Sequence, residues 1–335
     1  MRIVAALRIV ATVALTFLGL LLVTFLIGRV VPIDPVLAAV GDRAPPEVYE
    51  RVRVELGLHL PLHQQFRIYV SQVLHGDFGR SVLTANPVLA DIRRVFPATL
   101  ELATAGTLIG VLFGIPCGVV AAANQGRFID HLVRIVGLFG YSIPVFWLGL
   151  MALLVFYAHL GWAPGPGRLD VAFDDVVAPR TGVLLLDSAF QGEWEAFRNA
   201  FAHLVLPATI LGYFSLAYIS RMTRSFMLDQ LRQEYITTAR IKGLSERAVV
   251  WRHALGNVTV PLITVVALSY AGLLEGSVLT ETVFAWPGLG MYITHSLLNA
   301  DMNAVLGGTV VVGAVFIGLN LASDLLYRLA DPRTR

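Results

Sequence analysis

The feature that most constrains this sequence is a series of six long apolar runs separated by short charged segments. Each run has about 20 mainly apolar residues, the helix length needed to cross a bilayer core about 30 Å thick. Because backbone groups in lipid must bond within the segment, each run is expected to be a transmembrane helix. Charged residues make up only 14% of the chain, against about 25% in soluble domains. The pattern predicts an all-α polytopic membrane protein with spans at about 9–31, 99–123, 135–160, 201–221, 258–284 and 304–327.

Two of these runs need interpretation. Pro144 lies inside the third run and predicts a kink, because proline removes a helical hydrogen bond. The first run follows Arg2 and Arg8, as a signal peptide would. Its uncharged length of roughly 20 residues exceeds the roughly 7–15 of a signal core, so we expect it to be retained as a span. The chain then divides into residues 1–98, with the first span and an extracytoplasmic region, and a five-span core at 99–335.

The distribution of arginine predicts the orientation. The chain ends and the loops at 124–134 and 221–257 together hold 14 basic and 5 acidic residues. The other connections hold about 11 basic and 14 acidic residues. Since basic flanks stay on the cytoplasmic side, both termini and the 221–257 loop are expected in the cytoplasm. Segments 32–97, 161–200 and 285–303 are then expected outside.

Residues that several catalytic and metal-binding motifs require are missing. Lys242 is the only lysine and Gly243 follows it, so no GxxxxGK[ST] phosphate loop can form. There is no GxSxG nucleophile elbow. The eight histidines and Cys117 show no zinc-ligand spacing. We therefore expect no catalytic residue, metal or cofactor in this chain, and no nucleic-acid partner.

Four carboxylates lie within the predicted spans: Glu101, Glu275, Glu281 and Asp324. A charge in lipid is costly, so each is a candidate functional residue. All but Glu275 lie near span ends, where pairing with arginine or reaching water accounts for them. Glu275 lies deepest, and it either lines a polar pathway or bonds a neighbouring span. These acids leave open an ion-coupled secondary transporter, although the repeated halves common in that class are not visible.

The most informative loop runs from Glu234 to Asn257. Two short amphipathic helices are expected on either side of Gly243, which can adopt positive φ and reverse the chain as an elbow on the membrane surface. The elbow carries apolar side chains that need cover, namely Tyr235, Ile236, Ile241, Leu244 and Val249. A groove on a soluble partner would cover them. Packing under the protein's own spans is the alternative.

The segment Thr237-Thr-Ala-Arg-Ile-Lys-Gly243, with Leu255 twelve residues further on, resembles the EAA loop of type I ABC importer permeases. Thr237 and Thr238 stand where the pattern has Glu and Ala, so its salt bridge is not carried over. The form EYIxTARxKGL resembles the peptide and nickel permeases of this class. The resemblance implies that the loop, about 223–257, couples this chain to an ATPase through Glu234, Tyr235, Thr237, Thr238, Ala239, Arg240, Lys242, Gly243, Leu244 and Arg247.

The resemblance extends over essentially the whole chain. Segments such as 75–81, 96–102, 141–147, 202–207, 221–225 and 279–290 resemble the DppB, OppB, NikB and GsiC group of permeases. Membership would imply a bacterial inner-membrane importer subunit with the type I transmembrane fold. The implied cargo is dipeptides or short peptides, with nickel, glutathione or haem as alternatives within the group.

The same resemblance implies a set of partners. These are a second, DppC-like permease, two ATPases that are DppD- and DppF-like, and a DppA-like extracytoplasmic binding protein. ATP and Mg would bind in the ATPases. The loops 161–200 and 284–301 would dock the binding protein.

Overall fold

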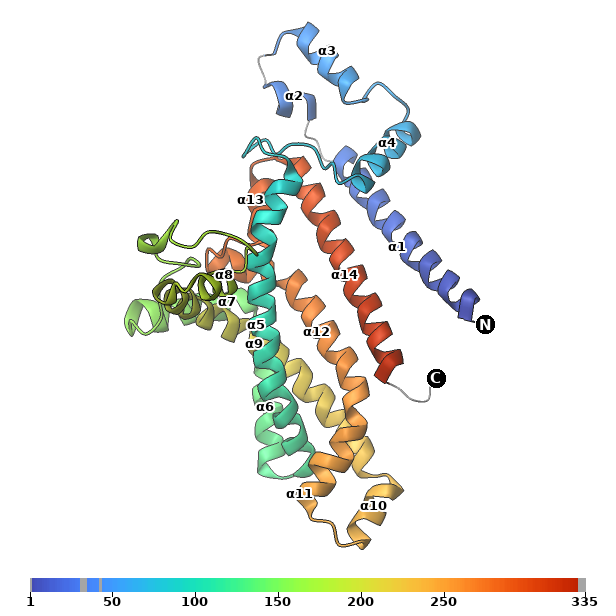
Figure 1. The fold of residues 1–335 in the computed structure, drawn as a ribbon, viewed down its shortest axis with the longest axis vertical. Coiled ribbons are helices and arrows are strands. Elements are labelled where there is room, and N and C mark those ends of the chain that lie inside the picture. The colour runs from blue at the N-terminus through green and yellow to red at the C-terminus, as the bar shows by residue number, and fades with distance from the viewer. Residues whose placement is uncertain (1, 31–34, 42–43, 331–335) are drawn as a thin grey trace. The chain divides into compact units, whose positions relative to one another are not determined.

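The structure, a computed structural model, describes residues 2–30, 35–41 and 44–330, and these residues form helices joined by turns (Figure 1). The two chain ends lie outside this description, so their predicted cytoplasmic position stays a prediction. The side chain of Asp324 lies outside it as well. The α-helices are α1 (Arg2–Val30), α2 (Pro35–Val40), α3 (Pro46–Glu55), α4 (Leu62–Leu74), α5 (Val88–Ala123), α6 (Phe128–Ser142), α7 (Val145–Ala152), α8 (Leu184–Gln191), α9 (Trp194–Leu231), α10 (Glu234–Ile241), α11 (Glu246–Ala248), α12 (Leu255–Val283), α13 (Leu289–Leu298) and α14 (Met302–Ala330). Two π-helical segments, Leu153–His159 and Val249–Ala254, and a 3-10 turn, Val171–Phe173, complete the set.

Five helical stretches among the described residues are long and apolar enough to cross a membrane: Ile9–Arg29, Val88–Ala123, Trp194–Leu231, Glu246–Val283 and Met302–Ser323. They correspond to five of the six predicted spans. The helical stretches Val88–Ala123, Trp194–Leu231 and Glu246–Val283 extend well beyond the predicted spans. In each case the helix continues past the apolar run into charged sequence. The all-α polytopic class is therefore confirmed.

The third predicted span differs from the expected kinked helix. α6 ends at Ser142 and α7 begins at Val145, and the two helices are bent by 99°. The break lies at Ile143, whose φ of −93° and ψ of 125° are extended. A residue before proline is disfavoured in the α conformation, so Pro144 ends the helix instead of bending it. The pair is one broken span or a re-entrant segment.

The chain forms two compact units, residues 1–96 with 288–318, and residues 97–287 with 319–335. In the first unit, Leu21 of α1, Val73 of α4 and Val310 of α14 share a buried apolar cluster. A second cluster joins Val88 at the start of α5 to Leu289 of α13. The division at 98/99 expected from the sequence stays a prediction.

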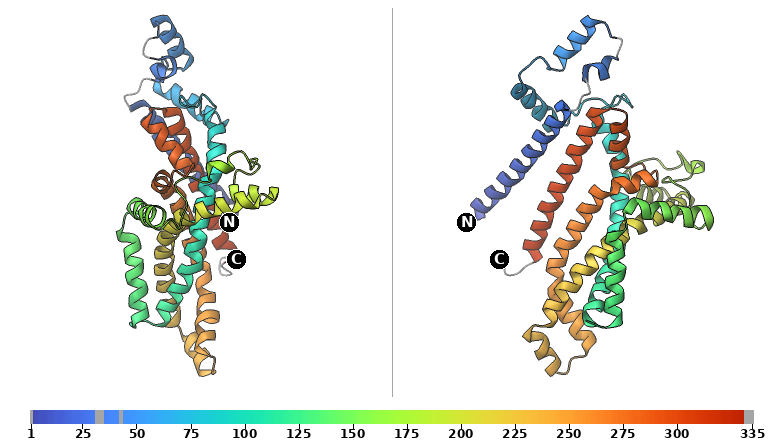
Figure 2. Two further views of the ribbon diagram at one scale, coloured as in Figure 1. Left: turned by 90° about the vertical axis from the view of Figure 1, so that its left-hand side faces the viewer. Right: turned by 180° about the vertical axis from the view of Figure 1, so that it is seen from behind.

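In the second unit, α9 packs against α6 and α12 (Figure 2). α5 approaches α9 through glycines at four-residue spacing, as small residues at helix interfaces in membranes allow. A Cβ added at Gly110 would lie 2.1 Å from Ser215 Oγ, and one at Gly118 would lie 2.5 Å from the Ser220 carbonyl oxygen. Bulk at either position would therefore separate the two helices.

Candidate functional site

The expected elbow is present as α10, a turn at Gly243 and α11, and it lies at one end of the second unit (Figure 1). Glu234 lies in the first turn of α10, where a carboxylate interacts favourably with the helix dipole. The N–H of Gly243 donates to the Arg240 carbonyl at 2.9 Å, and the N–H of Leu244 donates to the Ala239 carbonyl at 3.2 Å. This pair of bonds is the Schellman arrangement that ends a helix at a left-handed residue.

Gly243 has the positive φ that the sequence predicted, at +78°. A Cβ added there would meet nothing within 4 Å, so backbone conformation alone favours glycine at this position. After the turn, Ser245 caps α11 by accepting a bond from the Ala248 N–H at 3.4 Å. Arg240 and Glu246 then bridge the two helices, with Nε to Oε1 at 2.7 Å. The pair fixes the elbow locally, although both side chains are substantially exposed.

One face of the elbow is covered by the protein's own helices. Ile236 is 0% exposed, and Ala239 and Val249 are buried in the same cluster, which also includes Met227 of α9 and Val119 of α5. The sequence had grouped Ile236 and Val249 with the side chains that need a partner. For these two, the alternative of packing under the spans is the observed one.

The side chains on the other side of the elbow are not covered by any residue that the structure describes. Ile241 is 82% exposed, and Leu244 and Tyr235 are also exposed. The Tyr235 hydroxyl donates to Gln230 Oε1 at 2.9 Å, which leaves its ring outside the cluster. Three of the five apolar side chains that the sequence singled out therefore form an uncovered surface, which we call the elbow tip (Tyr235, Ile241 and Leu244).

The remaining predicted coupling residues lie close to the elbow tip in the sequence. Except for the buried Ala239, they are exposed: Glu234, Thr237, Thr238, Arg240, Lys242 and Arg247. Thr238 Oγ1 donates back to the Glu234 carbonyl at 3.0 Å and so satisfies itself within α10. Exposed polar residues together with exposed apolar ones have the composition of a docking surface.

An ion pair between α6 and α9 was not predicted from the sequence. Asp130, with a side chain 1% exposed, accepts from Arg224 Nε at 2.6 Å and from Arg224 Nη2 at 2.8 Å. The Gly126 N–H adds a bond at 2.9 Å. Arg224 belongs to the 221–225 segment that contributed to the resemblance. The pair fixes α9, which leads into α10, to the start of α6.

Glu275, the candidate pathway residue, lies exposed on α12. Glu281 is fully buried on the same helix and accepts hydrogen bonds from Thr99 Oγ1 at 2.7 Å and Ser277 Oγ at 2.9 Å. The two acids of α12 therefore differ, since one is held within the unit and the other faces out of it. The assignment of Glu275 to a pathway stays a prediction.

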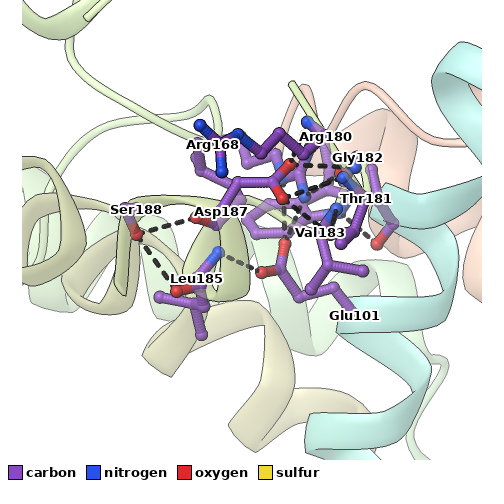
Figure 3. A network of polar contacts seen from close by, with 12 residues as sticks. Glu101, Arg168, Arg180, Thr181, Gly182, Val183, Leu185, Asp187 and Ser188 are labelled. Carbon is purple, nitrogen blue, oxygen red and sulfur yellow. Dashed lines mark hydrogen bonds and ion pairs between the residues drawn. The ribbon is translucent and has the colours of Figure 1, made fainter. Parts of the chain in front are cut away.

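A second polar site links α5 to the segment 168–187, and we call it the Glu101 network (Glu101, Arg168, Thr181, Gly182, Leu185 and Asp187; Figure 3). Arg168 Nη2 lies 2.6 Å from Glu101 Oε2, with side chains 15% and 4% exposed. The other carboxylate oxygen accepts from the Leu185 N–H at 2.9 Å. Arg168 also donates to the Gly182 carbonyl and lies over the Trp286 ring. The pairing with arginine expected for an acid near a span end is found at Glu101.

Asp187 holds the adjoining turn. Its carboxylate accepts from the N–H groups of Arg180, Thr181 and Gly182 at 3.1, 2.8 and 2.9 Å, and from the Thr181 hydroxyl at 2.8 Å. Burial by itself raises the pKa of this carboxyl, but the four hydrogen bonds outweigh burial and hold the pKa below its usual value. Asp187 therefore stays ionised at neutral pH and fixes the segment that pairs with Glu101.

The spans, the buried polar networks and the elbow define an integral membrane protein. Among the described residues, no group of three or more His, Cys, Asp or Glu side chains could hold a metal ion. Two family models match, "Binding-prot-dependent transport system membrane comp, N-term" over residues 2–103 and "Binding-protein-dependent transport system inner membrane component" over residues 114–335. The chain belongs to this family of inner-membrane permease subunits.

Curated relatives match over nearly the whole chain. The probable D,D-dipeptide transport system permease protein DdpB of Escherichia coli is 46% identical over 94% of this chain and 92% of its own. The di/tripeptide transport system permease protein DppB of Pseudomonas aeruginosa is 43% identical over 96% and 95%. A solved structure of the MetNI methionine ABC transporter, inward facing, matches with TM-score 0.49 and 19% identity over 70% of this chain and 93% of that chain.

Proposed function

We propose that this chain is one of two permease subunits of an ATP-driven importer that carries dipeptides or short peptides into the cytoplasm. The family supports the importer, and relatives above 40% identity named for dipeptide and di/tripeptide transport support the cargo. The ion-coupled alternative has less support, because the family depends on a binding protein and Glu275 is exposed, not buried, among the described residues.

The observation that carries the coupling role is the elbow tip. An isoleucine that is 82% exposed, beside an isoleucine of the same short helix that is fully buried, indicates a surface reserved for another protein. The elbow would insert into a groove on an ATPase, with both chain ends and the elbow in the cytoplasm. Closure of the ATPases on ATP would then move α9 and α12, which flank the elbow in the sequence.

The remaining partners follow from the same assignment. A homologous, DppC-like permease would complete the pathway, and DppD- and DppF-like ATPases would bind ATP and Mg. A DppA-like binding protein would deliver the peptide to the segment 161–200, which the Glu101 network holds in place, and to 284–301. Nickel, glutathione or haem would be carried instead if that protein selected them.

The test is reconstitution of the assembled importer in liposomes with a labelled dipeptide. Uptake should require both ATP and the binding protein and should persist when an ionophore collapses ion gradients. Uptake that follows the proton gradient and ignores ATP would contradict the proposal. Uptake of nickel, glutathione or haem without peptide would keep the importer and replace the cargo.

A further inference from the structure

A cavity of about 510 Å³ lies between the end of α5 and the elbow. It is of the size of small-molecule sites in proteins, which span about 300–1,000 Å³. Arg127, from the turn before α6, and Arg240 and Arg247, from the elbow, all line it. The cavity lies entirely within the second unit.

The charge of this cavity is strongly positive. Glu246 is the single acid among its lining residues, and it is already paired with Arg240. Three arginines against one glutamate leave a formal charge of +2 in the lining. Within the part of the chain that the structure describes, Arg127 and Arg247 form no ion pair. Two exposed arginines without an ion pair thus line one cavity, and guanidinium groups bind phosphate through paired N–H donors.

Apart from Asn124, the rest of the cavity wall is apolar. Val119 and Val120 of α5, Leu231 at the end of α9 and Trp251 line it. Trp251 is 40% exposed, and tryptophan is enriched where a helix meets the headgroup region of a bilayer. A cavity with arginines on one side and the ends of membrane helices on the other suits an amphiphile better than an acidic side chain alone.

We propose that this cavity binds an anionic phospholipid of the cytoplasmic leaflet, with the phosphate between Arg127 and Arg247 and an acyl chain along Trp251. Basic pockets between membrane helices on the cytoplasmic side bind such headgroups. A bound lipid joins the α5–α6 turn to the elbow, so it regulates the element that meets the ATPase. The inference rests on the proposed orientation, in which this end of the second unit faces the cytoplasm.

Trp251 provides a direct readout. The assembled importer is placed in mixed micelles with brominated phosphatidylglycerol or brominated phosphatidylcholine, and the Trp251 signal is the fluorescence difference from W251F. The phosphatidylglycerol should quench Trp251 saturably, and the phosphatidylcholine should not. The double variant R127Q/R247Q should need roughly 30-fold more lipid, about fivefold for each arginine lost near the surface.

The matched control is R232Q/R252Q, which removes two exposed arginines of the same region that do not line the cavity. It should quench as the unmodified importer does. Equal quenching by both lipids, or an unchanged response in R127Q/R247Q, would overturn the proposal. So would quenching that appears only after the ATPases are removed, which would assign the cavity to an acidic partner side chain, or displacement by millimolar inorganic phosphate.

The quenching measurement requires neither ATP hydrolysis nor transport, so it tests the lipid site separately from the proposed function. A chain that failed to recruit ATPases could still show the lipid site, and a working importer could lack it. The thermal stability of each variant confirms that a lost signal reports binding, since both arginines are exposed and should leave the fold unchanged.

Discussion

In the Glu101 network the buried carboxylates find their hydrogen-bond donors within this chain, whereas at the elbow an apolar side chain stays exposed. Both oxygens of Glu101 have donors within the second unit, and both oxygens of Asp187 do as well. At the elbow, Ile236 is covered but Ile241 is not, although both belong to α10. The first region is complete within one chain and can serve as a fixed platform. The second region leaves Ile241 exposed, as the proposed coupling element would before a partner covers it.

The largest expected effect comes from breaking the platform. E101A leaves the largely buried Arg168 side chain without its carboxylate partner. Removing one partner of a buried ion pair destabilises a protein by about 3–5 kcal/mol. Thermal unfolding of the purified protein should shift strongly, and proteases should cleave between Arg168 and Asp187. E275A is the matched control, since it removes a glutamate that is exposed. Equal destabilisation by the two changes would show that burial of the pair is not the cause.

The two isoleucines of α10 test the contrast within the elbow. I236A removes a fully buried side chain and should lower the free energy of unfolding by about 2–5 kcal/mol. I241A should leave unfolding almost unchanged but weaken retention of the ATPases during purification, because an exposed residue contributes only when a partner covers it. Melting curves and ATPase stoichiometry separate the outcomes. A stable I241A importer with full ATPase retention would remove the tip from the interface.

Gly243 should transmit motion through its backbone conformation. G243V forces a β-branched residue into the left-handed region, at about 1–2 kcal/mol, and should uncouple ATP hydrolysis from uptake. G126V is the matched control, because Gly126 has φ of +76° and open space around an added Cβ. G243N should behave more mildly, since asparagine tolerates this conformation. Equal uncoupling by G126V and G243V would indicate general strain instead of a coupling role.

The smallest effect is a pH dependence of the platform. Because the pKa of Asp187 is lowered in the folded protein, its contribution to stability is complete above the unfolded value of about 3.9 and is lost as pH falls through the folded value. Protease access to the 168–187 segment should therefore increase only at acidic pH. D187N should raise access at neutral pH and flatten the dependence. An unchanged acid transition in D187N would assign it to another group.

The elbow was predictable because its determinants are local. Gly243, the apolar residues around it and the resemblance of 237–243 all lie within a few turns of chain. The same holds for the spans, whose apolar runs directly reflect the solvent around them. The extent of the break at Pro144 was not predictable, because a proline allows either a kink or a stop and the sequence alone does not say which occurs.

The two buried ion pairs could not be predicted from the sequence for a different reason. Glu101 and Arg168 are 67 residues apart, and Asp130 and Arg224 are 94 apart. With 24 arginines in the chain, sequence alone does not say which one meets a given acid. The glycines at 106, 110, 114 and 118 are a local pattern that indicates close helix packing, but the pattern does not say which helix packs there.

The proposed coupling role requires the elbow tip to be a docking surface for an ATPase. A photo-crosslinking amino acid at position 241 tests it directly in the assembled importer, with position 171 as the control, since Val171 is 83% exposed but belongs to a different segment. The account predicts that position 241 captures an ATPase, with a yield that changes when ATP binds, and that position 171 does not. An importer that retains its ATPases while position 241 captures neither of them would contradict the account.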